Sequence, residues 1–166
     1  MLASALPFIL AFLAGFLVKA VDWMDDDRKS KHPSKYVFAA AYGLAIGYLI
    51  GTASFSVLFL AALVAQVFAR KIDTVAHQLG FAIAAISLFA FGFPSLDVMV
   101  FVFFVALAFL DELKLVGALK PLTDYRMFLK LGALVMVAFG RWDYLVAILL
   151  FDGAYMLFGL LGKYIK

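Results

Sequence analysis

The sequence contains no cysteine, which excludes disulfide bonds, thiolate metal sites and cysteine nucleophiles. Charged residues are also scarce, at 15% of the 166 residues, whereas 67% are hydrophobic. An ordinary soluble domain is only about half apolar. The formal net charge is +3, but the basic residues are scattered between apolar runs, so nucleic acid is not an expected partner. The composition indicates an integral membrane protein whose main partner is the lipid bilayer.

Chain length limits the number of domains and membrane spans. A helix needs about 20 apolar residues to cross about 30 Å of hydrocarbon, so 166 residues can supply about seven spans and no separate soluble domain. The N-terminal apolar run lacks a preceding positive segment and a small-residue cleavage site, and we interpret it as a retained first span. We therefore predict one transmembrane helical domain over residues 1–166.

Seven apolar runs follow one another along the chain. They are 2–21, 36–50, 53–69, 75–93, 98–110, 127–140 and 144–161. The stretch 36–69 is too long for one span, because at about 1.5 Å per residue it would extend about 20 Å beyond the hydrocarbon. We expect it to turn at residues 51–54, and we expect further breaks at Pro94 and Pro121. The sequence thus predicts an all-α, polytopic bundle of about seven spans.

The basic residues indicate an orientation for this bundle. Short cytoplasmic loops carry the excess of Lys and Arg in membrane proteins. With the N-terminus outside and the C-terminus in the cytoplasm, all but two of the 14 Lys and Arg residues fall on the cytoplasmic side. Arg141 falls outside, and Lys19 lies in the first span near its inner end, from which it can reach the same cytoplasmic surface. We predict a multi-pass protein of the cell membrane.

Small residues recur every fourth position on the second run, at Ala39, Gly43, Gly47 and Gly51. Such a face lets the backbone of another helix approach closely. Two interpretations stay open: ordinary packing within one chain, or an interface between subunits that could also form the wall of a pore.

The eleven acidic residues are the most informative feature of so apolar a chain. An ionised carboxylate inside hydrocarbon costs at least about 2.5 kcal/mol unless water, a cation or a partner compensates it. Asp22 and Asp26 lie one helical turn apart at the inner end of the first run and are expected to share a face. Paired carboxylates suit Mg²⁺, Ca²⁺ or Mn²⁺. The alternative is a solvated acidic cap at the end of the helix.

Two further groups of candidate metal ligands lie at the same expected depth. Asp73 precedes His77 by one helical turn, which places two possible ligands on one face. Asp111 and Glu112 follow directly after an unbroken apolar run. The alternative for His77 is an interfacial polar residue without a ligand role.

Asp152 lies near the centre of the last run, where only protein or water could solvate it. Tyr155 shares its helical face, and Asp97 and Asp143 lie at the outer ends of the fifth and seventh runs. These four residues could mark a path for cations, because acidic rings are a common filter. The alternative for Asp152 is a buried neutral carboxyl group bonded to a neighbouring helix.

The first functional hypothesis is therefore a cation-permeable channel or cation-binding transport protein. A chain of this size cannot readily enclose a pore alone, so we expect a symmetric homo-oligomeric ring, a tetramer or pentamer. The Asp-rich, Phe-rich and cysteine-free chain resembles an uncharacterised type of archaeal membrane protein proposed to be an oligomeric cation channel.

The second hypothesis is a Mg²⁺-dependent membrane enzyme that acts on a lipid diphosphate. The segment Asp22-x-x-x-Asp26 resembles the carboxylate pair of UbiA-type prenyltransferases, and the resemblance implies that this pair holds Mg²⁺ and diphosphate. Arg28, Arg70 and Lys71 could then bind phosphate oxygens. The resemblance covers this segment alone, because the family's second Asp-x-x-x-Asp and the asparagine before the first are both absent. A scaffold without transport or chemistry is the third hypothesis.

Overall fold

The computed structural model describes residues 2–27, 32–113 and 115–164, with side chains from residue 5 to 25 in the first stretch. Over these residues the regular secondary structure is entirely helical, which confirms the all-α prediction. The elements are α1 (Leu2–Asp22), η1 (Trp23–Asp27), α2 (Ser34–Thr52), α3 (Ser56–Phe68), α4 (Val75–Phe91), α5 (Val98–Asp111), η2 (Gly117–Leu119), α6 (Lys120–Asp124), α7 (Met127–Ala138) and α8 (Trp142–Leu161).

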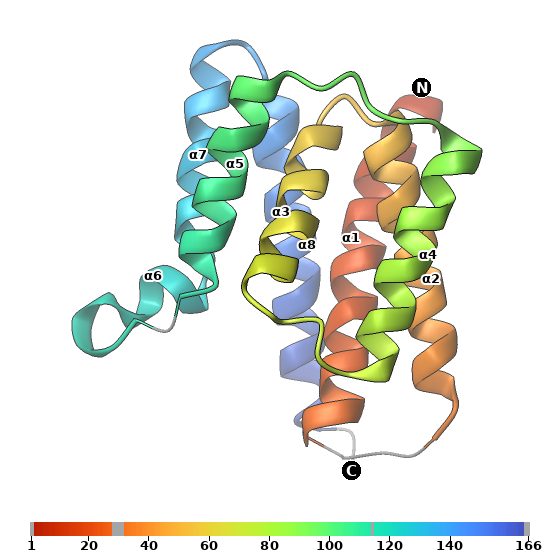
Figure 1. Ribbon diagram of the computed structural model, residues 1–166. Coiled ribbons are helices and arrows are strands. Elements are labelled where there is room, and N and C mark those ends of the chain that lie inside the picture. Colours follow the sequence, from red (N-terminus) through yellow and green to blue (C-terminus); the bar gives the residue numbers. More distant parts are fainter. Residues whose placement is uncertain (1, 28–31, 114, 165–166) are drawn as a thin grey trace.

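The helices form one bundle (Figure 1). The short α6 projects from the side of the bundle, whereas the other seven α-helices of the described residues lie along its axis and alternate in direction. We call the end at which α1 begins the upper end and the end at which η1 lies the lower end. Helix α2 packs against α1 and α4, α8 packs against α1 and α7, and α5 packs against α3 and α7.

The predicted apolar runs coincide with helices to within a few residues. The expected turn is confirmed, because α2 ends at Thr52 and α3 begins at Ser56. Pro94 lies between α4 and α5, as predicted. Pro121 does not break a helix but lies in the first turn of α6, where its missing N–H leaves no hydrogen bond unmade.

Among the described residues, two helical stretches are long and apolar enough to cross a membrane. These are Ala5–Asp25, which continues α1 into η1, and Trp142–Leu161, which is α8. Four other apolar helices, α3, α4, α5 and α7, are shorter, at 10–17 residues each. The seven crossings and their orientation therefore stay predictions.

The small-residue stripe of α2 packs against α4 within the same chain. A Cβ atom added at Gly43 would lie 2.5 Å from the carbonyl oxygen of Gly80, and one added at Gly47 would lie 2.5 Å from Cβ of Ser87. Real Cβ atoms do not approach other atoms so closely, so glycine is required for this helix contact. The structure thus assigns the stripe to packing within the chain.

Aromatic rings fill the interior above the lower end of the bundle. The ring centroids of Phe8 and Phe55 lie 5.3 Å apart, those of Phe55 and Phe59 5.9 Å, and those of Phe59 and Phe151 5.8 Å. This row joins α1, α3 and α8 by tilted and edge-to-face contacts. The apolar core therefore extends down to Phe151, and below it the interior becomes polar.

Candidate active site at the lower end of the bundle

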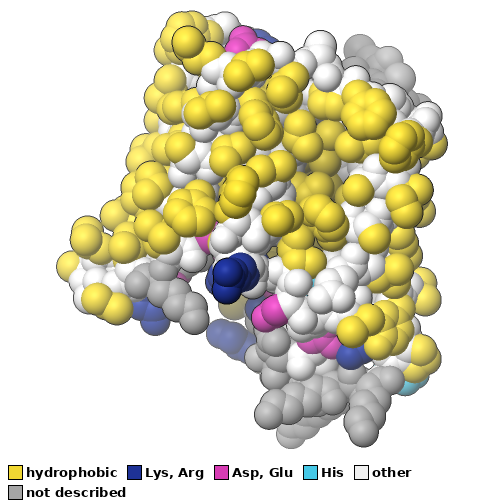
Figure 2. Space-filling model, viewed as in Figure 1, with side chains coloured by type: hydrophobic (Ala, Val, Ile, Leu, Met, Phe, Trp, Pro, Cys, Tyr) yellow, Lys and Arg dark blue, Asp and Glu magenta, His cyan; other side chains and the backbone are white. Residues whose placement is uncertain are grey.

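A polar cavity of about 340 Å³ opens at the lower end of the bundle. Figure 2 shows that Lys, Arg, Asp and Glu side chains gather around a hollow there, while the face above is almost entirely hydrophobic. The walls come from α1, α2, α3, α4 and α8 and from the connections before α4 and α7. Its ionisable side chains are Asp22, Tyr42, Lys71, Asp73, His77, Glu112, Arg126 and Tyr155.

Local helix signals place His77 in this cavity. Helix α4 begins directly after Thr74, whose side-chain oxygen accepts a hydrogen bond from the backbone N–H of His77 at 3.3 Å. This is an N-cap, which satisfies one of the free donors in the first helical turn. The cap fixes where α4 starts and therefore which face of the first turn carries the imidazole.

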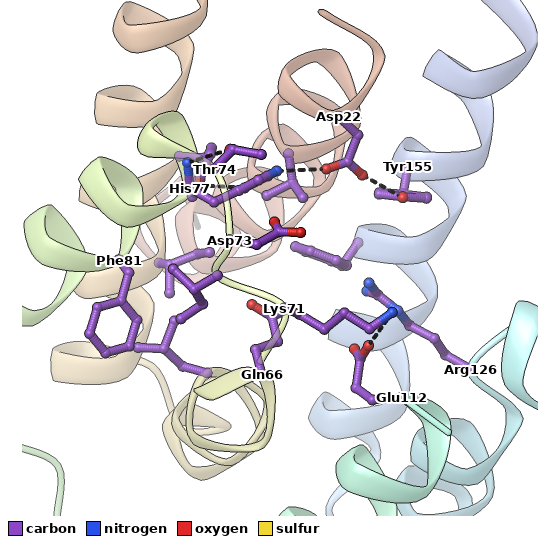
Figure 3. Close-up of a pocket in the computed structure, with 16 residues that line it drawn as sticks. Asp22, Gln66, Lys71, Asp73, Thr74, His77, Phe81, Glu112, Arg126 and Tyr155 are labelled. Carbon is purple, nitrogen blue, oxygen red and sulfur yellow. Dashed lines mark hydrogen bonds and ion pairs between the residues drawn. The ribbon is translucent and has the colours of Figure 1, made fainter. Parts of the chain in front are cut away.

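Asp22 stands between His77 and Tyr155 (Figure 3). Its Oδ1 lies 2.9 Å from Nε2 of His77, and its Oδ2 accepts a hydrogen bond of 2.5 Å from the Tyr155 hydroxyl. On the other side of the imidazole, Nδ1 of His77 lies 3.0 Å from the hydroxyl of the buried Tyr42. We call this continuous chain, Tyr42–His77–Asp22–Tyr155, the relay. It ties together four helices, α2, α4, α1 and α8.

The relay is compatible with both the neutral and the protonated form of His77. With the proton of a neutral ring on Nε2, that N–H donates to Asp22, and Nδ1 accepts from Tyr42. When the ring is protonated, both nitrogens donate, and the carboxylate of Asp22 stabilises the positive charge. The relay therefore accommodates His77 in either state without a change of partners.

Arg126 supplies positive charge to the opposite wall of the cavity. Its backbone has a φ of 49° in the left-handed region directly before α7. Its guanidinium carbon lies 5.3 Å from the ring centroid of Tyr155 and 5.7 Å from that of Phe151, and Nη1 lies 3.5 Å from Oδ1 of Asp152. Burial acts to lower the pKa of Arg126, but the attraction to Asp152, Glu112, Tyr155 and Asp22 together outweighs it, so the pKa lies above its ordinary value.

Lys71 and Glu112 form an ion pair of 3.6 Å at the mouth of the same cavity (Figure 3). Asp73 is exposed there, and no ion pair or hydrogen bond holds it among the residues that the structure describes. The cavity thus has three acidic and two basic side chains on its walls, with Asp22 and His77 deep within and Asp73 and Lys71 nearer solvent.

Asp152 has two basic partners and does not line the cavity. Its carboxylate lies 2.9 Å from Nζ of Lys130 as well as 3.5 Å from Arg126, and its side chain is only 8% exposed. Basic side chains of the protein therefore surround Asp152, as the expectation of solvation by protein or water allows, and the alternative of a neutral carboxyl group stays a prediction. Helix α7 is much shorter than α8, so its first turn lies beside the middle of α8 and brings Lys130 to Asp152.

Asp111 forms the N-terminal cap of a neighbouring helix. Its two oxygens accept hydrogen bonds from the backbone N–H groups of Phe128, at 3.0 Å, and Leu129, at 2.8 Å. Arg126 occupies the cap position of α7 but cannot accept such bonds, so Asp111 from α5 satisfies the free donors. The structure thus places Asp111 outside the cavity walls, apart from its expected neighbour Glu112.

The two acidic residues predicted at the outer end also have local partners. Asp97 caps α5 by accepting from the N–H groups of Met99 and Val100, at 3.0 and 3.1 Å. Asp143 accepts from Arg141 at 3.1 Å and from the Ser54 hydroxyl at 2.6 Å. Both lie at the upper end of the bundle, away from the cavity.

The predicted metal ligands are only partly brought together. Asp22, Asp73, His77 and Glu112 share the cavity, whereas Asp111 does not. Within the described side chains, no group of three or more His, Asp or Glu residues is arranged to hold a metal ion. The side chain of Asp26 lies outside the described residues, so its pairing with Asp22 and the divalent cation stay predictions.

Two residues line the cavity although the sequence did not indicate them as site residues. From the sequence, Arg126 is only one of the basic residues that indicate the orientation, and Tyr42 is not a candidate site residue. The position of Tyr42 next to Gly43 is the signal that the sequence offers. Because α2 and α4 are in close contact at Gly43, the hydroxyl of Tyr42 reaches His77. No family model, no curated protein and no solved structure matches this chain.

Proposed function

We propose that this chain is a multi-pass membrane enzyme whose lower end faces the cytoplasm. Large apolar side chains are exposed over the outside of the bundle, among them Ile86, Phe89, Val102, Leu134 and Leu149. Soluble monomers rarely expose apolar patches above a few hundred Å². Figure 2 shows the hydrophobic surface over the upper part of the bundle and the charged groups below it, as expected for a protein immersed in lipid to the level of the cavity.

The substrate that fits the cavity best is a lipid with a phosphate or diphosphate head. The observation that carries this proposal is the placement of the His77–Asp22 pair and of two cations, Arg126 and Lys71, around one cavity. A guanidinium presents planar donors that match phosphate oxygens, and a lysine adds a mobile positive charge. The cavity volume of about 340 Å³ is that of a small-ligand site and suits a headgroup.

The relay supplies acid–base chemistry to that head. When a water molecule attacks the terminal phosphorus, the Tyr42 hydroxyl, which also lines the cavity, can accept a proton from that water and pass its own proton to Nδ1 of His77. Asp22 stabilises the imidazolium that results. The bond from phosphorus to the leaving oxygen breaks as the new P–O bond forms, and the imidazolium can return the proton to the leaving oxygen by the same route. Tyr155 holds the second oxygen of Asp22 and thereby fixes its orientation. Proton transfer of this kind contributes about 10² to 10⁴ in rate.

The sequence also pointed to Mg²⁺ as a cofactor for such an enzyme. Asp22 is committed to His77 and Tyr155, and the described side chains offer no set of three ligands. We therefore propose that Arg126 and Lys71 stabilise the negative charge of the phosphate, and we assign no step to a metal ion.

The cation-channel hypothesis stays a prediction and has less support from the geometry. Asp152 is compensated by Lys130 and Arg126, so it offers little free negative charge to a passing cation. The row of rings from Phe8 to Phe151 fills the interior above the cavity. A cation path would have to run between copies of the chain in the expected ring, a tetramer or pentamer.

The proposal is tested with the purified chain in nanodiscs, supplied with farnesyl diphosphate with and without Mg²⁺. We expect the compound to be consumed, and we expect His77→Ala to lower turnover about 100-fold or more. Asp143→Asn is the matched control, because it removes a paired carboxylate at the upper end. Cation-selective currents in planar bilayers without any consumption of the lipid would overturn the proposal in favour of the channel.

A further inference from the structure

We propose that a groove between α3 and α4 holds the hydrocarbon chain of the lipid whose head occupies the cavity, so that the substrate enters sideways from the bilayer. The identity of the head rests on the function proposed above. The binding of a hydrocarbon chain in the groove is a separate claim, and it is tested separately below.

The groove is a second hollow, of about 490 Å³, beside the polar cavity. Its walls are formed by Val67 at the end of α3, by Arg70, Ile72 and Asp73 in the connection, and by Phe81 on α4. The last three of these also line the polar cavity. The two hollows therefore adjoin across a thin wall of three side chains, one of them the exposed Asp73.

The packing of the bundle explains why a hollow exists here. Helix α4 packs against α2, whereas α3 packs against α5 and α2, and α3 and α4 are not among the closely packed pairs. The connection between them leaves α3 through Arg70, whose φ of 54° is in the left-handed region. The backbone N–H of Lys71 then donates to the carbonyl oxygen of Gln66, just after the end of α3. Helix α3 therefore ends without packing closely against α4.

The surroundings of the groove match an amphiphile with one hydrocarbon chain. Val67 on the groove wall is exposed, and so are Phe68 at the end of α3 and Val75 at the start of α4. These apolar side chains would face lipid in the proposed orientation. Arg70, also exposed, lies on the groove wall and can meet a phosphate at the membrane surface. A polar head would thus lie against the ionisable side chains of the cavity (Figure 3), and the hydrocarbon chain would lie against Val67, Ile72 and Phe81 in the groove.

The test uses a benzophenone-tagged farnesyl diphosphate and the equally tagged farnesol, each photo-crosslinked to the wild-type chain in nanodiscs. We expect both probes to label residues 67–81. Val67→Trp fills the groove from an exposed position, and we expect it to weaken binding of farnesyl diphosphate at least about tenfold without changing the binding of inorganic pyrophosphate. Phe89→Trp, also exposed on α4 but outside both hollows, is the control.

The outcomes separate the groove from the proposed function. Labelling confined to other helices, or an unchanged affinity of Val67→Trp for farnesyl diphosphate, overturns the groove even if the lipid is consumed. A third outcome combines two results: tagged farnesol labels residues 67–81 in the wild type but not in Val67→Trp, and the wild type does not bind pyrophosphate. This outcome supports the groove and rejects the phosphate head. Because the crosslinking is measured on the wild-type chain, it decides the question even if the tryptophan variant does not fold.

Discussion

Nε2 of His77 lies 2.9 Å from Oδ1 of Asp22, and this contact links α4 directly to α1 at the lower end of the bundle. Both helices pack against α2, from which Tyr42 adds its hydroxyl to the same imidazole. A histidine between a carboxylate and a phenol is an arrangement suited to proton transfer. The proposed chemistry therefore depends on the contact between His77 and Asp22.

The first prediction concerns the carboxylate of this pair. Asp22→Asn keeps the size of the side chain but removes the negative charge that stabilises protonated His77. We expect the turnover of farnesyl diphosphate to fall about 100-fold or more while the protein still folds. Release of phosphate or diphosphate from radiolabelled substrate measures the effect. A variant with full turnover would show that the carboxylate has no part in the chemistry.

The second prediction concerns the buried ion pair of Asp152 with Lys130. Asp152→Ala leaves Lys130 and Arg126 without their partner, and we expect a loss of about 3 to 5 kcal/mol in the free energy of unfolding. Lys130→Ala in the same background should cost much less than in the wild type, with a coupling energy of about 1 kcal/mol or more. Unfolding in mixed detergent micelles gives all four values. Strictly additive losses would contradict the ion pair.

The third prediction tests the cation path on the same residue. If Asp152 guides cations, the wild-type protein should carry cation-selective currents in planar bilayers, and Asp152→Asn should lower their conductance. If Asp152 only forms ion pairs with Lys130 and Arg126 and has no part in conduction, the currents of Asp152→Asn and of the wild type should be alike. Asp97→Asn, at the upper end, serves as the comparison for a nonspecific effect of charge.

The fourth prediction concerns the contact of α2 with α4. Gly43→Ala would place Cβ 2.5 Å from the carbonyl oxygen of Gly80, so the helices must separate, at a cost of about 1 to 3 kcal/mol. Gly153→Ala is the matched control, because no atom lies within 4 Å of its added Cβ, and it should be neutral or stabilising by up to about 1 kcal/mol. The melting temperatures of the two variants compare them. Equal melting temperatures of Gly43→Ala and Gly153→Ala would contradict the close contact between Gly43 and Gly80.

The fifth prediction concerns topology. Because the chain has no cysteine of its own, Ser34→Cys and Ser95→Cys each report a single position. Ser34 begins α2 at the lower end, and Ser95 lies between α4 and α5 at the upper end. In sealed vesicles an impermeant maleimide should reach them from opposite sides. Labelling of both from the same side would end the seven-span prediction.

The sequence by itself determined the helices and the turns between them. A long apolar run bounded by glycine, proline or charge has few alternatives to a helix, so the runs matched the observed elements and the turn after Thr52 was correctly placed. The sequence does not predict the small helix α6, because its five residues carry no apolar periodicity and its proline indicates a break. The same local reasoning correctly selected Asp22, Asp73, His77 and Glu112 as residues of one end of the bundle.

Only the tertiary structure decided which partners these residues have. An ion pair depends on which helices are neighbours and on how far each is shifted along the bundle axis, and neither quantity is a property of one segment. The short α7 starts beside the middle of α8, and this offset gives Asp152 its partner Lys130. In the same way, the close crossing of α2 and α4 brings Tyr42 to His77. The sequence therefore determined which residues are polar in an apolar chain, and packing decided which of them meet in the cavity.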